Sequence, residues 1–78
     1  MKVKLNTVRR IYIADDYIKL DSLLKYASIV STGGEAKMLV QNARVYVGGE
    51  PCMMRGKKII PGDVVRCGDS VLLVSKKT

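Results

Sequence analysis

The sequence contains no histidine, no tryptophan and no phenylalanine, and only two cysteines among its 78 residues. Histidine is the commonest general base and the commonest metal ligand near neutral pH, so its absence argues against acid–base catalysis and against most metal sites. Cys52 and Cys67 cannot by themselves supply the four ligands of a structural zinc site. We therefore expect a protein with no metal and no other cofactor.

Long hydrophobic runs are also missing. No stretch approaches the roughly 20 apolar residues that a membrane-spanning helix needs, and no apolar signal-peptide core follows residues 1–5. The two cysteines are enough for one disulfide, but nothing in the sequence indicates export to an oxidising compartment. We therefore expect free thiols, a cytoplasmic location and no membrane partner.

Acidic residues are half as numerous as basic ones: seven Asp and Glu stand against fourteen Lys and Arg, a net charge of +7. Such an excess on one small domain favours a polyanionic partner, nucleic acid before an anionic membrane, although surplus lysine can also serve solubility alone. A chain of this length buries too little surface to enclose a large active site. We expect a single domain over residues 1–78 that is not an enzyme and takes no small-molecule substrate.

Two periodicities divide the sequence. Alternating β-branched and aromatic residues predict a strand over residues 8–13. Apolar residues recur at i, i+3, i+4 and i+7 from Leu20 and again from Ala36, which predicts two helices. After residue 44, short β-branched runs between glycine and proline turns predict a small, mainly antiparallel sheet of four to five strands. The fold class is therefore α+β, and we expect a flexible tail over residues 75–78.

The start of the second helix carries the sharpest local signal. The run from Thr32 through Gly33 and Gly34 to Glu35 matches a capping box, with Thr32 as N-cap. A second interpretation stays open, because backbone N–H groups beside glycines at a helix start also favour a bound phosphate. Capping uses two of these donors and Glu35 repels an anion, so we favour capping.

A valine-rich segment precedes Gly48-Gly49 and a proline-containing segment follows it. Two glycines between two such segments predict a hairpin with a two-residue turn. Pro51 in the second arm has no N–H to donate to a neighbouring strand. We therefore expect that arm to lie at the edge of the sheet.

Basic residues gather between residues 35 and 58, where five bases face two acids. Together with one glutamine they are predicted on one face of the second helix and in a loop after the hairpin: Lys37, Gln41, Arg44, Arg55, Lys57 and Lys58. If helix and hairpin pack side by side, these cations form a continuous surface that neutralises phosphates. The tyrosines are expected to pack in the core or at its edge rather than to stack on bases: Tyr12, Tyr17, Tyr26 and Tyr46.

This succession of signals resembles the S-four-type RNA-binding domain, a family named after the fourth protein of the small ribosomal subunit and built on the αL motif. The likeness spans about residues 18–67 and is carried by four segments: Lys19–Leu24, Glu35–Lys37, Val45–Glu50 and Pro61–Val65. Residues 31–37 and 55–58 are most similar to the small stand-alone bacterial branch called YaaA-like.

The resemblance implies a non-catalytic, ribosome-associated module that binds structured RNA, such as ribosomal or transfer RNA, in ribosome assembly or translation. We expect it to act as a monomer. Carried over by position, the RNA-binding surface comprises Thr32, Gly33, Gly34, Lys37, Gln41, Arg44, Arg55, Lys57 and Lys58. Many members have arginine where this chain has Gly33, which removes one phosphate contact or replaces it by backbone amides. Gly48 stands where asparagine is common, which should change the turn little.

Two other functions stay open. A DNA-binding helix-turn-helix would present Glu35, Lys37, Met38 and Gln41 to a major groove. The helix start, however, offers glycines and Glu35 to the bases instead of long hydrogen-bond donors. A protein-interaction adaptor would use Met53 and Met54, one of which would be exposed if this segment is a strand. Competition between duplex DNA and structured RNA separates the first from RNA binding, and binding that survives nuclease and high salt would favour the second.

Overall fold

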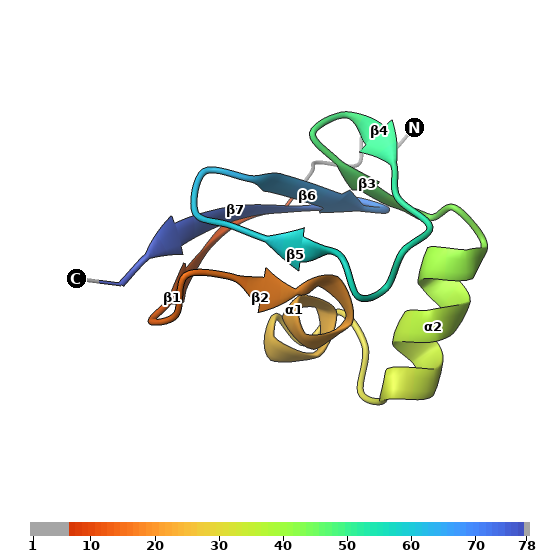
Figure 1. Cartoon of the computed structure of the whole chain (residues 1–78). Coiled ribbons are helices and arrows are strands. Elements are labelled where there is room, and N and C mark those ends of the chain that lie inside the picture. Colours follow the sequence, from red (N-terminus) through yellow and green to blue (C-terminus); the bar gives the residue numbers. More distant parts are fainter. Residues whose placement is uncertain (1–6, 78) are drawn as a thin grey trace.

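The structure, a computed structural model, describes residues 7–77. Its elements follow in the order β1 (Thr7–Ile13), β2 (Ile18–Lys19), α1 (Leu20–Tyr26), α2 (Gly33–Gln41), β3 (Val45–Val47), β4 (Glu50–Pro51), β5 (Lys58–Ile59), β6 (Val64–Cys67) and β7 (Ser70–Lys76). Five strands form one sheet in the order β1-β7-β6-β3-β4, and β2 pairs with β5 separately. Figure 1 shows α1 beneath the large sheet and α2 beyond one end of it. The predicted α+β class is confirmed.

The large sheet is antiparallel except for one pair. β1 and β7 run parallel, so the whole of the intervening chain forms their crossover connection. Their ladder reaches as far as the pairs Tyr12 with Ser75 and Ile13 with Lys76. Ser75 and Lys76 therefore belong to the sheet, and the tail expected from residue 75 does not begin there because β1 holds these two residues by backbone pairing. Thr78 lies outside the described residues.

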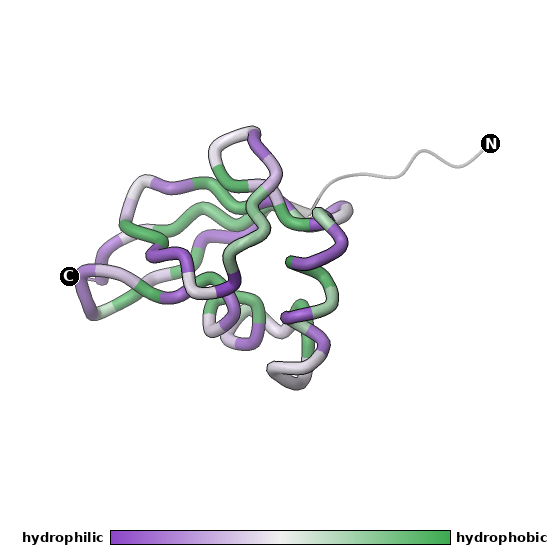
Figure 2. Tube along the Cα trace, turned by 45° about the vertical axis from the view of Figure 1, so that its right-hand side comes forward, coloured by the Kyte–Doolittle hydropathy of each residue, from purple (hydrophilic) through white to green (hydrophobic). Residues whose placement is uncertain are grey.

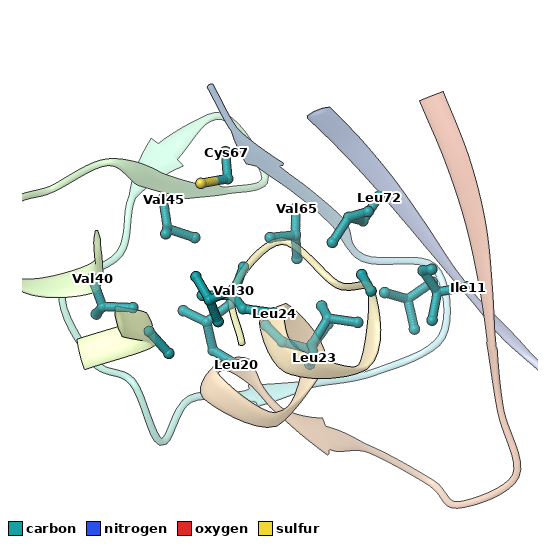
Figure 3. Close-up of a cluster of buried hydrophobic side chains, with 14 of the residues drawn as sticks. Ile11, Leu20, Leu23, Leu24, Val30, Val40, Val45, Val65, Cys67 and Leu72 are labelled. Atoms are coloured by element: carbon teal, nitrogen blue, oxygen red, sulfur yellow. The ribbon is translucent and has the colours of Figure 1, made fainter. Parts of the chain in front are cut away.

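The hydrophobic core lies between this sheet and the two helices. Figure 3 shows apolar side chains from both layers turned toward one another. Inward-facing apolar residues of the strands take part, as do the apolar stripes of α1 and α2: Ile11, Leu20, Leu23, Leu24, Ala36, Val40, Val45, Val65 and Leu72 are all buried. Each buried leucine or valine contributes roughly 1.5–3 kcal/mol to folding. The helical stripes predicted from Leu20 and Ala36 are thus confirmed, and they join both helices to one hydrophobic core.

The C-terminal end of each helix is followed by a residue in the left-handed conformation, Ser28 after α1 and Ala43 after α2. After α2, the Arg44 N–H donates to the Leu39 carbonyl at 3.0 Å, which is the long hydrogen bond of a Schellman motif. Glycine is the usual residue at this position because a Cβ is strained there. The turn at Ala43 redirects the chain from α2 into β3 and places Arg44 at the corner between them.

Pairing at the hairpin follows the sequence prediction. β3 and β4 are antiparallel around Gly48 and Gly49, both of which have positive φ. β4, which contains Pro51, is an outer strand of the sheet. Within residues 7–77, no helix is long and apolar enough to cross a membrane.

Candidate nucleic-acid interface

The capping box at the start of α2 is present. The Thr32 hydroxyl accepts from the Glu35 N–H at 3.2 Å, and the Glu35 carboxylate accepts from the N–H groups of Ser31 and Thr32 at 2.9 and 3.2 Å. Gly33 and Gly34 begin the helix; a Cβ at Gly33 would meet open space, and one at Gly34 would be in ordinary contact with the Thr32 hydroxyl, at 3.8 Å. In the described part of the chain, neither glycine N–H donates a hydrogen bond. The helix start therefore presents two unused donors beside a carboxylate that is already engaged.

Along α2 the polar side chains lie on the outside. Lys37 and Gln41 are exposed and one helical turn apart, and Arg44 is exposed just after the helix ends. At 1.5 Å per residue the nine residues of α2 extend about 13 Å. In Figure 2 hydrophilic stretches alternate with hydrophobic ones along α2, as expected for a helix with one face toward the core.

The basic loop, residues 55–58, is fixed to the start of α1 by its backbone. The Asp21 N–H donates to the Arg55 carbonyl and the Leu20 N–H donates to the Lys57 carbonyl, both at 2.9 Å. These carbonyls satisfy N–H groups that a helix start otherwise leaves without partners. The side chains of Arg55 and Lys57 are exposed. The loop is therefore a supported element that holds its two cations toward solvent.

Lys58 lies at the far end of this loop, in β5. Its ammonium is 4.9 Å from the centre of the Tyr17 ring, a cation–π contact across the small sheet. Lys58 therefore stands at the end of the loop beside Tyr17 and opposite the exposed Lys19 of β2.

The helix and the loop are neighbours in space. In both Figure 1 and Figure 2 the segment from β4 to β5 descends beside α2. We call this combined region the basic surface: Thr32, Gly33, Gly34, Lys37, Gln41, Arg44, Arg55, Lys57 and Lys58. Within residues 7–77 none of its five cations forms an ion pair, whereas Lys76 pairs with Asp16 at 3.0 Å elsewhere. Five unpaired positive charges are thus available to an external anion.

Two sequence expectations about exposed residues were wrong. All four tyrosines are 39–62% exposed. Tyr12 and Tyr46 on strands and Tyr26 on α1 face away from the core, and Tyr17 lies in the connection between β1 and β2. Met53 and Met54 are both exposed, by 63% and 69%. They lie in an irregular segment rather than in a strand, so the alternation that would bury one of them does not apply.

One further cation adjoins the basic surface and was not indicated by the sequence analysis. Arg66 on β6 is directly opposite Tyr46 on β3. A shallow hollow of about 480 Å³ at this place is lined by Asn42, Ala43, Arg44, Tyr46, Arg66 and Gly68. Arg66 lies between the buried Val65 and Cys67 on the strand, and this alternation puts the arginine on the face opposite the core. The same alternation in the sequence could have indicated that Arg66 is exposed.

The two cysteines are free thiols; Cys67 is buried, and Cys52 lines a hollow that Lys57 of the basic surface also lines. Burial raises the pKa of the Cys67 thiol. The Cys52 thiol is half-buried and directed at the Met54 carbonyl, with a sulfur–oxygen distance of 3.6 Å. No group of three or more candidate metal ligands comes together within residues 7–77.

Comparison with known proteins assigns the chain to a family. A family model described as the S4 domain matches residues 11–75. The chain belongs to the S4 domain family. The predicted resemblance is confirmed, and it extends beyond residues 18–67 into β1 and β7. All nine residues of the basic surface lie inside the matched part of this S4 domain.

The S4 domain is also similar to a curated bacterial protein. It is 40% identical over 55 residues to the probable ribosome maturation protein RlbA of Bacillus subtilis (strain 168). The alignment covers 70% of this chain and 78% of that protein.

Proposed function

We propose that this S4 domain is a non-catalytic module that binds structured RNA through the basic surface. The observation that carries the proposal is the placement of α2 beside the basic loop, with five exposed cations that have no ion-pair partner in the described chain. Neutralising phosphates with such cations releases counterions, and this release supplies most of the affinity for a nucleic acid. Membership of the S4 domain family supports RNA as the polyanion.

The individual residues suit different parts of an RNA helix. Lys37, Arg55 and Lys57 act as point charges or guanidinium donors toward phosphates. Gln41 offers an amide that can donate to and accept from a 2′-hydroxyl, the group that distinguishes RNA from DNA. We expect about four to six phosphate contacts in total, which gives a steep loss of affinity with salt.

The biological setting follows from the bacterial relative. Because that protein is named for ribosome maturation, we infer that ribosomal RNA or its precursor is the partner of this S4 domain. The site of action would then be the cytoplasm, where ribosomes assemble. The protein would act there as a monomer without a catalytic step.

The decisive experiment titrates the protein into a labelled hairpin from ribosomal RNA and into duplex DNA of equal length, from 50 to 300 mM salt. We expect the RNA to bind more tightly. The double substitution Lys37→Gln with Lys57→Gln should reduce its affinity at least tenfold. The matched control, Lys25→Gln with Lys77→Gln, removes the same charge from exposed sites outside the basic surface. Equal binding of DNA, or equal losses in both double variants, would contradict the proposal.

One observation favours a second function. Met53 and Met54 are adjacent, both exposed, and lie next to Arg55. Exposed methionines are adaptable contacts for another protein. A ribosome-associated adaptor would bind its partner after nuclease treatment and in high salt, whereas the RNA-binding module would lose its partner under both conditions.

A further inference from the structure

The large sheet has a face that neither helix covers. Because strand residues alternate, the positions between the buried ones point away from α1 and α2. We call this the outer face; its central residues are Arg10, Tyr46, Val64, Arg66, Val71 and Leu73. The strand registers make them neighbours, since Tyr46 is opposite Arg66, Arg66 is opposite Val71, and Leu73 is opposite both Val64 and Arg10.

The outer face carries positive charge without compensation on the same strands. Arg10 and Arg66 are exposed, and none of the described strand positions that share this face holds Asp or Glu. Stacking two copies of this face would bring like charges together, so a second copy of the chain is a poor occupant. An anionic ligand fits better.

The end of the outer face near β3 has the groups that a nucleotide requires. Tyr46 is 39% exposed, and the hollow beside it is also lined by Asn42, Arg44 and Arg66. An exposed aromatic ring offers a stacking surface to any base, and flanking guanidinium groups bind phosphates. The arrangement therefore suits a stacked, unpaired nucleotide better than a flat protein surface.

Arg44 connects this hollow to the basic surface. It stands at the corner where the left-handed Ala43 turns the chain from α2 into β3. An RNA strand that leaves a structured RNA held against α2 would pass Arg44 and reach the hollow beside Tyr46, which Arg44 and Arg66 both line. The two regions thus form one continuous path around the corner of the domain.

We propose that the outer face is a second RNA contact, in which an unpaired nucleotide next to the structured RNA stacks on Tyr46 while Arg44 and Arg66 bind its phosphates. This proposal rests on the proposed function of the basic surface. It adds a preference for RNA in which a helix adjoins a single strand.

The test compares a blunt RNA hairpin with the same hairpin carrying four unpaired nucleotides at either end. The wild-type protein should bind a tailed hairpin about fivefold more tightly or better. Tyr46→Leu and Arg66→Gln should each remove that gain and leave blunt-hairpin affinity unchanged, and Arg66→Gln should lower the salt slope by about one for the tailed RNA only. Tyr46→Phe keeps the ring and should keep the gain, as should the charge control Lys25→Gln. Thermal unfolding checks that each variant is folded.

The outcomes separate the two proposals. If the tail adds no affinity, or if Tyr46→Leu and Arg66→Gln bind both RNAs as the wild type does, the outer face is not an RNA contact and the basic surface proposal stands. The same conclusion follows if Lys25→Gln loses the gain as well. If the wild-type protein binds neither hairpin, both proposals fail together.

Discussion

The ammonium of Lys58 lies 4.9 Å from the centre of the Tyr17 ring and so links β5 to the connection between β1 and β2. The two residues come from segments about forty positions apart in the sequence, and their contact sits beside the antiparallel pair of β2 and β5. It holds one cation of the basic surface in a defined place instead of leaving it to move freely in water.

This contact should be measurable as a coupling energy. Tyr17→Leu and Lys58→Ala should show a coupling of about 0.5–1 kcal/mol in the free energy of unfolding, since an exposed cation–π contact is worth that much. Urea unfolding of the two single variants and the double variant gives the value. Pairing Tyr17→Leu with Lys37→Ala, on α2, should give additive effects. A coupling of zero for Tyr17 and Lys58 would mean that the contact does not persist in solution.

RNA binding should depend on the basic loop through charge. Lys57→Ala and Lys58→Ala should each weaken binding to a ribosomal RNA hairpin and reduce the slope of log affinity against log salt by about one, because each removes one phosphate contact. Titrations at four or more salt concentrations measure the slope. An unchanged slope in the double variant would remove the loop from the interface.

The cap of α2 should contribute to stability. Thr32→Ala removes the hydroxyl that accepts from the Glu35 N–H, so the free energy of unfolding should fall by about 1 kcal/mol. Thr32→Ser keeps the acceptor and should behave nearly as the wild type. If Thr32→Ala leaves stability intact and lowers RNA affinity, then the helix start binds a phosphate and its role in capping is minor.

A glycine should be better than alanine at the end of α2. Ala43 has a φ of 55°, a conformation that costs roughly 1–2 kcal/mol for a residue with a Cβ. Part of the gain from Ala43→Gly is offset by the greater freedom of glycine in the unfolded chain, so we expect a net stabilisation of about 0.5 kcal/mol. Ala36→Gly, inside the same helix, should destabilise by about 1 kcal/mol or more. Destabilisation by Ala43→Gly would show that the left-handed turn is not strained.

The two thiols should differ in reactivity. Burial raises the pKa of Cys67 above its ordinary value of 9.0, so at pH 8 it holds less thiolate, the reactive form. Cys67 should therefore be alkylated by iodoacetamide more slowly than Cys52, as measured by mass spectrometry on Cys52→Ser and Cys67→Ser. Faster alkylation of Cys67 would contradict its burial.

The same pKa shift has a consequence for stability. The folded state keeps the Cys67 proton to higher pH than the unfolded chain does, so the unfolded chain binds fewer protons above pH 9. The free energy of unfolding should therefore fall as pH rises beyond about 9, and less so in Cys67→Ser. Equal pH dependence in the two proteins would remove Cys67 as the cause.

Local signals predicted those parts of the fold that depend on neighbours in the sequence. The capping box at Thr32, the helical stripe from Leu20 and the hairpin around Gly48 each involve residues within a few positions, and the structure has all three. The pairing of β1 with β7 depends on residues more than sixty positions apart. No local pattern encodes it, which is why Ser75 was expected in a tail.

The candidate site was only partly predictable for a related reason. Alternation shows that Tyr46 and Val45 point to opposite sides, but it does not show which side faces the helices. The exposure of Tyr46 follows from the packing of α1 against the other face of the sheet, and its place opposite Arg66 follows from the register of β3 and β6. β2 and β5 contain two residues each, too few for any periodicity, so the contact of Lys58 with Tyr17 could not be foreseen.

The register of β1 and β7 also sets the order of events in assembly. Thr7 pairs with Ser70, and closing a loop of that size costs about 4 kcal/mol in chain entropy. Both helices and the hairpin can form from nearby contacts, while this long-range closure comes late. Leu72 and Val74, which belong to the buried core between the sheet and the helices, arrive with β7. A nascent chain therefore carries every cation of the basic surface before its core is complete, and full affinity for RNA should emerge only when β7 has joined the sheet.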